Sequence, residues 1–231
     1  MKKKIFLDTN LKNKSKTVED KIQLFEYDGY KLPLPTEIEI SESGTCNRSC
    51  AFCPRSAADF QDKKEFISNE LHEKLCTELQ KLNYKGTIRY SGFVEPMLDK
   101  NIYNLISMVK NFLPDCNVEM VTNGDPLNLN RLNKVFRSGL NRILISAYDG
   151  KEDADKLEDL CKEAQLSSNQ YIVRHRYYSE EQDFGITLSN RSGLMENAEF
   201  KIESLKEPLK NPCYIPSYTF FLDYQGDVLM C

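Results

Sequence analysis

The chain has 231 residues, of which 40% are hydrophobic and 29% are charged, and its formal net charge at pH 7 is −4. This composition excludes a disordered chain and a strongly basic surface, so we expect one main domain and no nucleic-acid partner. The apolar run after the basic N-terminus is too short for a signal peptide and no later run is long enough for a membrane span, which predicts a cytoplasmic protein without a membrane partner.

Extended and helical patterns alternate from Glu37 onward, which is typical of a parallel sheet whose strands are joined by crossover helices. Five segments have the character of strands: 37–41, 87–92, 117–124, 142–150 and 171–178. Apolar residues at helical spacing predict helices between them, with stripes at 71–82, 102–112, 129–136 and 157–161. The sequence therefore predicts an α/β fold.

The flanking regions are less regular. Residues 1–36 are treated as a separate N-terminal segment to which the sequence assigns no role. Residues 179–212 are mainly polar and indicate a long connection. The last segment, 217–231, is predicted to form two strands around a turn at Gln225–Gly226.

Three cysteines follow the first predicted strand directly, in the segment CNRSCAFCPR at 46–55. Loops at the carboxyl ends of parallel strands are where binding sites of α/β proteins form. Three thiolates can hold three irons of a four-iron cluster and leave the fourth iron open to another ligand. Cys46, Cys50 and Cys53 are therefore candidate metal ligands.

Zinc is the alternative for this loop, because cysteine pairs commonly hold structural zinc. The Cys-x3-Cys-x2-Cys spacing is not the usual paired one, and a fourth ligand is needed. The two histidines, His72 and His175, lie on a predicted outer helix and on a distant strand. Cys76, Cys116 and Cys161 lie on or beside apolar patterns and are expected to be small buried side chains.

The cysteine loop resembles that of the radical S-adenosylmethionine enzymes, which reads Cys-x3-Cys-x-aromatic-Cys, with Phe52 at the aromatic position. The resemblance extends over roughly 37–231. It implies a partial (βα)6 parallel barrel, a [4Fe-4S] cluster on the three cysteines and S-adenosylmethionine at the open iron. It also implies a 5'-deoxyadenosyl radical that abstracts hydrogen from a substrate.

The segment SGFVEPML at 91–98 is similar to the family's Gly-Gly-Glu-Pro motif. By that resemblance Gly92, Glu95 and Pro96 belong to the site that receives the amino group of S-adenosylmethionine. Val94 stands where a glycine is more usual. Without the resemblance, a Glu-Pro pair at a strand end is an ordinary turn.

Two later strand ends carry similar motifs, VTNG at 121–124 and ISAYDG at 145–150, the latter with one residue inserted. The resemblance implies that Asn123 and Ser146 contact the ribose or the carboxylate of the cofactor. A capped turn is the alternative for both. Arg174 is a candidate partner for the carboxylate, since its fork matches that geometry, or else a solvated charge.

Cys213 and Cys231 flank the last predicted hairpin. This arrangement resembles the start of the extension called SPASM, or of its shorter relative called twitch, which binds auxiliary iron–sulfur clusters. The predicted organisation is therefore a core at 37–200 and the start of such an extension at 201–231. Because the family continues with further cysteines, we expect a fragment; a chance pair of buried cysteines is the alternative.

These resemblances imply an enzyme that acts on a peptide or on a small molecule such as a sugar or aminosugar, with electrons from a flavodoxin- or ferredoxin-type donor. The alternative class is a non-catalytic iron–sulfur or zinc-stabilised binding protein, in which Glu95, Asn123 and Ser146 are incidental. A third hypothesis is a fragment that cleaves S-adenosylmethionine but no longer turns over its substrate.

Overall fold

The computed structural model describes residues 22–50, 53–56, 60–177, 207 and 218–229, and the structural statements below concern these. Its centre is a seven-stranded sheet with the order β11-β10-β3-β6-β7-β8-β9. All neighbours are parallel except β11, which runs antiparallel to β10. The strands are β3 (Glu37–Ile40), β6 (Thr87–Tyr90), β7 (Asn117–Thr122), β8 (Arg142–Ala147), β9 (Tyr171–His175), β10 (Thr219–Leu222) and β11 (Val228–Leu229).

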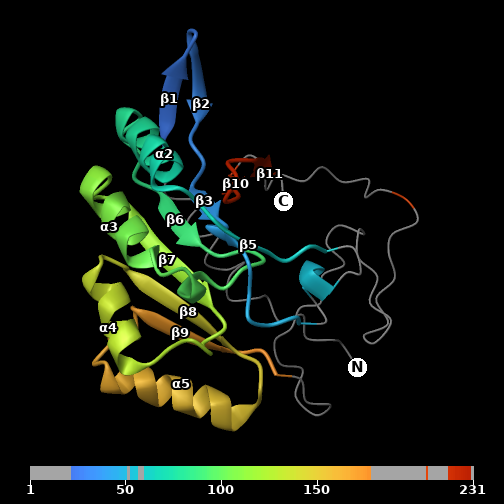
Figure 1. Ribbon diagram of the computed structural model, residues 1–231. Helices are drawn as coiled ribbons and strands as arrows, with labels where there is room; N and C mark the ends of the chain where they lie inside the picture. Colours follow the sequence, from blue (N-terminus) through green and yellow to red (C-terminus); the bar gives the residue numbers. More distant parts are fainter. Residues whose placement is uncertain (1–21, 51–52, 57–59, 178–206, 208–217, 230–231) are drawn as a thin grey trace, which may run out of the picture.

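The predicted helices are all present and lie along one face of the curved sheet (Figure 1). Ser68 begins the first of them, because its side chain accepts a hydrogen bond from the backbone N–H of Leu71. Alternate strand residues such as Ile38 and Ile88 point toward these helices and form the core with helix residues such as Leu105. The helices are α2 (Asn69–Lys81), α3 (Ile102–Phe112), α4 (Leu129–Arg137) and α5 (Lys151–Glu163).

The strands end earlier than the sequence predicts. Gly92, Gly124 and Gly150 lie beyond the ends of β6, β7 and β8, with φ of +115°, +84° and +111°. Glycine tolerates this left-handed region, which turns the chain out of the sheet. The last residues of these three predicted strands are therefore loops. The loops carry the candidate site residues Gly92, Glu95 and Asn123, whereas Ser146 stays within β8.

The predicted C-terminal hairpin is confirmed as β10 and β11, with Gly226 at φ +94° in the turn. Its place in the fold was not predicted. β10 pairs in parallel with β3, from Thr219 opposite Glu37 to Leu222 opposite Ile40. The hairpin thus extends the main sheet on the side of its first strand.

Two small antiparallel pairs were also not predicted. β1 (Leu24–Tyr27) and β2 (Tyr30–Pro33) form a hairpin that projects from one end of the molecule (Figure 1). β4 (Ser43–Gly44) pairs with β5 (Lys63–Phe66). Because the cysteines lie between β4 and β5 in the chain, this pair brings the two ends of the cysteine loop together.

Charged side chains occupy the sheet face opposite the helices. Arg89 on β6 donates to Glu37 on β3 at 2.6 Å and to Glu119 on β7 at 2.7 Å. The three side chains are only 12%, 8% and 8% exposed. Burial lowers the pKa of Arg89, but the two carboxylates outweigh this effect and raise it. Arg89 therefore stays charged, and its hydrogen bonds tie three neighbouring strands together.

Cys76, Cys116 and Cys161 are buried, as predicted. The described helices include none that is both long enough and apolar enough to cross a bilayer.

Candidate active site

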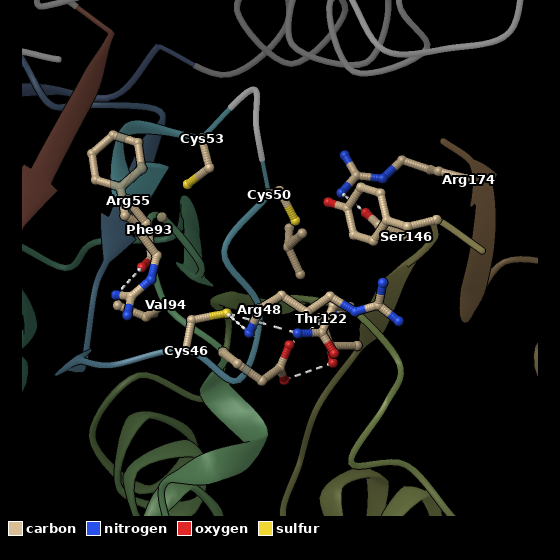
Figure 2. Close-up of a pocket in the computed structure, with 15 residues that line it drawn as sticks. Cys46, Arg48, Cys50, Cys53, Arg55, Phe93, Val94, Thr122, Ser146 and Arg174 are labelled. Carbon is tan, nitrogen blue, oxygen red and sulfur yellow. Dashed lines mark hydrogen bonds between the residues drawn. The ribbon is translucent and has the colours of Figure 1, made fainter. Parts of the chain in front are cut away.

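A pocket opens at the carboxyl ends of the parallel strands (Figure 2). Most of the predicted site residues line it together: Cys46, Cys50, Cys53, Gly92, Glu95, Asn123, Ser146 and Arg174. Pro96 lies next to this group as the first residue of a short 3-10 helix, Pro96–Leu98. Phe52, Cys213 and Cys231 lie outside the described residues.

The three candidate thiols face the pocket from one loop (Figure 2) and are partly buried. Burial raises the pKa of Cys46 and raises that of Cys50 to about 11. These two cysteines are therefore neutral thiols near pH 7, and binding a metal there would release protons.

The arrangement of these thiols bears on which metal group they fit. Among the described residues, no three Cys, His, Asp or Glu side chains are close enough together to hold one metal ion. A tetrahedral zinc needs its sulfur ligands about 4 Å apart, given Zn–S bonds of about 2.3 Å. A four-iron cluster binds each thiolate at a separate corner, so three separated thiols around one pocket fit the cluster better.

Neither histidine completes a zinc site in the pocket. His72 points into the core, where its Nε2 is 2.8 Å from the hydroxyl of Tyr90, and burial lowers its pKa to about 4. His175 lies 3.1 Å from the hydroxyl of Tyr177 through its Nδ1. The described pocket lining contains neither of them.

Glu95 connects two strand ends. Its carboxylate accepts hydrogen bonds from the hydroxyl of Thr122 at 2.7 Å and from the backbone N–H groups of Asn123 at 2.7 Å and Met97 at 3.0 Å. The side chain is almost wholly buried, and burial raises its pKa to about 6 against the opposing effect of these bonds. Glu95 therefore holds the loop after β6 against the end of β7.

Asn123 connects β7 to the cysteine loop. Its side-chain oxygen accepts from the backbone N–H of Asp125 at 3.0 Å, which is the capped turn considered as an alternative. Its amide nitrogen also donates to the side chain of Asn47 at 2.7 Å and approaches the sulfur of Cys46 at 3.8 Å. The capped turn and the contact with the site are thus present together.

On the opposite wall of the pocket, Arg174 of β9 donates to the hydroxyl of Ser146 of β8 at 2.7 Å. Tyr148 lines the same wall, and burial raises the pKa of its phenol. This tyrosine lies in the ISAYDG segment, which is one residue longer than the motif, and it is a lining side chain that the sequence interpretation missed.

Arg55 was also missed, although it follows the last cysteine closely. Its guanidinium donates to the backbone carbonyl groups of Gly44 at 3.3 Å and Phe93 at 3.1 Å, and it pairs with Asp62. The ring of Phe60 lies 4.9 Å from its central carbon. Arg55 therefore ties the end of the cysteine loop to β4 and to the loop after β6.

Residues 40–188 match the family described as the Radical SAM superfamily. The chain belongs to this superfamily. The match includes all three cysteines of the pocket and the strand ends from β3 to β9, so membership agrees with the geometry of the site. A member of this superfamily is an enzyme, as the sequence predicted.

This radical SAM protein is similar to curated members of the superfamily. An S-adenosyl-L-methionine-dependent 2-deoxy-scyllo-inosamine dehydrogenase of Niallia circulans is 26% identical over 194 residues, which is 84% of this chain and 72% of that protein. A probable GTP 3',8-cyclase of Thermococcus kodakarensis is 29% identical over 131 residues, covering 56% of this chain and 40% of that protein.

Solved structures support the fold. BtrN in complex with AdoMet and 2-DOIA superposes with a TM-score of 0.67 at 24% identity, covering 86% of this chain and 73% of that one. The structure of anSMEcpe with bound AdoMet superposes with a TM-score of 0.50 at 13% identity, covering 61% of this chain and 42% of that one. The α/β fold with a mostly parallel sheet is therefore that of radical SAM proteins.

Proposed function

We propose that the protein binds a [4Fe-4S] cluster through Cys46, Cys50 and Cys53 and cleaves S-adenosylmethionine reductively at its open iron. The observation that carries this proposal is the set of three thiols that face one pocket at the carboxyl ends of a parallel sheet. No fourth cysteine lines that pocket among the described residues, so one iron is left for the cofactor.

When bound, the reduced cluster and S-adenosylmethionine together supply a 5'-deoxyadenosyl radical that abstracts a hydrogen atom from the substrate. The chain's own residues bind and orient. Asn123, Ser146 and Arg174 line the walls where the ribose and carboxylate of the cofactor are proposed to lie. Gly92 and the backbone near Glu95 form the side proposed for its amino group.

We further propose that the substrate is a small polyhydroxylated molecule oxidised at an alcohol carbon. The name of the Niallia circulans relative, a dehydrogenase of an inosamine, supports this class over a peptide. In such an oxidation the carbon loses a hydrogen atom to the radical, then the hydroxyl loses a proton and the second electron leaves. The product is a ketone.

The second electron requires an acceptor, and we propose an auxiliary iron–sulfur cluster with Cys213 and Cys231 among its ligands. Both lie outside the described residues, in the segment that resembles the start of a SPASM or twitch extension of a partial barrel. A flavodoxin- or ferredoxin-type protein is the proposed donor of the first electron.

Anaerobic reconstitution with iron and sulfide, then reduction with S-adenosylmethionine present, tests the proposal. We expect 5'-deoxyadenosine from the wild-type chain and none after Cys46, Cys50 and Cys53 are changed together to alanine. Cys161→Ala is the matched control, because that buried thiol lies on α5 and does not line the pocket. Release that survives the triple replacement would contradict the proposal, as would preferential binding of zinc.

Glu95→Gln separates this enzyme from a non-catalytic iron–sulfur protein. We expect the iron content to be kept while affinity for S-adenosylmethionine falls at least tenfold, because the variant disturbs the loop proposed for the amino group. Unchanged affinity, measured by equilibrium dialysis, would favour the non-catalytic alternative.

A further inference from the structure

Arg48 lies in the cysteine loop, between Cys46 and Cys50, and reaches two acids beyond the loop. Its Nε and Nη2 donate to the two carboxylate oxygens of Asp125, at 2.7 and 2.5 Å. Its Nη1 and Nη2 donate to the two oxygens of Asp149, at 2.8 and 2.6 Å. Four of the five N–H groups of the guanidinium are thus bound in two bidentate pairs.

The two acids belong to neighbouring strands of the sheet. Asp125 follows the end of β7, and Asp149 follows the end of β8. The guanidinium carbon of Arg48 also lies 5.5 Å from the ring of Tyr148, in the range of a cation–π contact. We call Arg48 with Asp125 and Asp149 the arginine clamp. It joins the cysteine loop to two fixed points of the fold.

The clamp is more than an isolated surface ion pair. The side chain of Arg48 is only 20% exposed, and that of Asp125 is 33% exposed. Asn47, the preceding residue, donates to the same Asp125 carboxylate at 2.6 Å and accepts from Asn123 at 2.7 Å. Single exposed ion pairs contribute little to stability, whereas bidentate pairs within a network are the exception.

We propose that Arg48 is a positioning residue, which holds the loop of Cys46 and Cys50 on the ends of β7 and β8 before the cluster binds. This inference rests on the proposed function, because it assigns the loop its iron–sulfur ligands. The physical reason is preorganisation: a loop already held in its binding geometry loses less conformational freedom when the ligand arrives.

Lysine at this position separates geometry from charge. Arg48→Lys keeps one positive charge near the two acids but cannot form two bidentate pairs, because an ammonium lacks the planar fork. Asp149→Asn is the milder change, since it weakens one of the two pairs at the more exposed acid, which is 60% exposed. Asp115→Asn is the matched control for an acid-to-amide change, because Asp115 pairs with Lys85 away from the pocket.

The test measures alkylation of each thiol in the metal-free protein, resolved by peptide mass spectrometry. We expect Arg48→Lys to raise the alkylation rates of Cys46 and Cys50 at least fivefold. The buried thiols of Cys76, Cys116 and Cys161 report on the integrity of the fold and should stay as slow as in the wild type. Asp115→Asn should change none of these rates.

Unchanged rates for Cys46 and Cys50 in Arg48→Lys would overturn the proposal. If the buried thiols also react faster in Arg48→Lys, that variant has loosened the whole fold, and the milder variant Asp149→Asn becomes the test. The proposal then stands only if Asp149→Asn accelerates the alkylation of Cys46 and Cys50 and of no buried thiol. As a second readout, iron loss to a chelator from the reconstituted protein should be at least fivefold faster in Arg48→Lys. A wild-type chain that binds no iron would defeat the proposed function, while the alkylation result would still test the clamp.

Discussion

Replacing Arg89 by methionine should destabilise the protein by about 3–5 kcal/mol at pH 8, the cost typical of breaking a buried ion pair by removing one partner. Arg89 bridges Glu37 and Glu119 at 2.6 and 2.7 Å, and both carboxylates are 8% exposed. Methionine fills much of the same space but leaves two buried carboxylates without their shared cation. The loss is therefore electrostatic rather than a matter of volume.

This destabilisation should depend on pH. In the Arg89→Met variant we expect burial without a paired cation to favour the protonated form of these carboxyl groups in the folded state. A carboxyl group with a raised folded pKa stabilises the fold below its unfolded pKa, and that contribution is lost as the pH rises through the folded pKa. The difference between wild type and Arg89→Met should therefore be smaller at pH 5 than at pH 8.

Urea unfolding of the metal-free protein at both pH values measures the effect through the midpoint and slope. Arg142→Met is the matched control, because Arg142 lies 3.8 Å from Glu119 and is 34% exposed; a change below about 1 kcal/mol is expected for so loose a pair. A loss below about 1 kcal/mol for Arg89→Met at pH 8, or an equal loss at both pH values, would refute the reasoning.

Gly92→Ala should destabilise the fold by about 1–2 kcal/mol from backbone strain alone, because φ is +115°, and an added Cβ would also lie 2.1 Å from the hydroxyl oxygen of Ser41. Ser41→Gly removes this contact but also the hydrogen bond from Ser41 to the backbone carbonyl of Ser91. In the Ser41→Gly background, Gly92→Ala should therefore cost only the part due to strain, measured by thermal unfolding against Ser41→Gly alone. Burial holds the pKa of His72 near 4, below its unfolded value of about 6.5. Its neutral form should therefore contribute stability that is lost, by up to about 3 kcal/mol, as the pH falls from 6.5 to 4. The difference in unfolding free energy between wild type and His72→Gln should show this loss; a difference independent of pH would contradict it.

The sequence predicted the repeating part of the fold because local patterns determine it. Four amphipathic helices and five parallel strands follow from apolar spacing alone. The position of β10 in the sheet does not follow from local patterns. Apolar spacing identifies a segment as a strand, but it does not identify the partner strand when that partner is distant in the chain. The β1–β2 hairpin does have a local signal in the sequence: Asp28 and Gly29, with φ of 50° and 76°, form the turn, and Asp-Gly is a favoured pair in such turns.

The sequence predicted the candidate site residues that belong to recognisable motifs. It missed those whose role depends on contacts with distant parts of the chain. Cysteine spacing located the loop, and the resemblance of three strand-end motifs to those of the family pointed to Glu95, Asn123 and Ser146. Arg48 and Arg55 act through partners on other elements, so no local pattern marks them. Glu95 shows the remaining gap: sequence resemblance implied a contact with the cofactor, while the structure adds three hydrogen bonds within the protein itself.

The parallel pairing of β10 with β3 also affects the order in which the sheet can form during synthesis, because β3 is made long before β10. Backbone contacts at this junction join residues 182 positions apart, as in the hydrogen bond from the N–H of Thr36 to the carbonyl of Tyr218. A ribosome adding roughly 5–20 residues per second needs about 10–40 s to make the intervening chain. During that interval one edge of β3 has no partner from β10, while the cysteines that follow β3 have already emerged. We therefore expect newly made chains to be most prone to pairing with other chains through this strand edge, and to oxidation of these thiols, before β10 has been made.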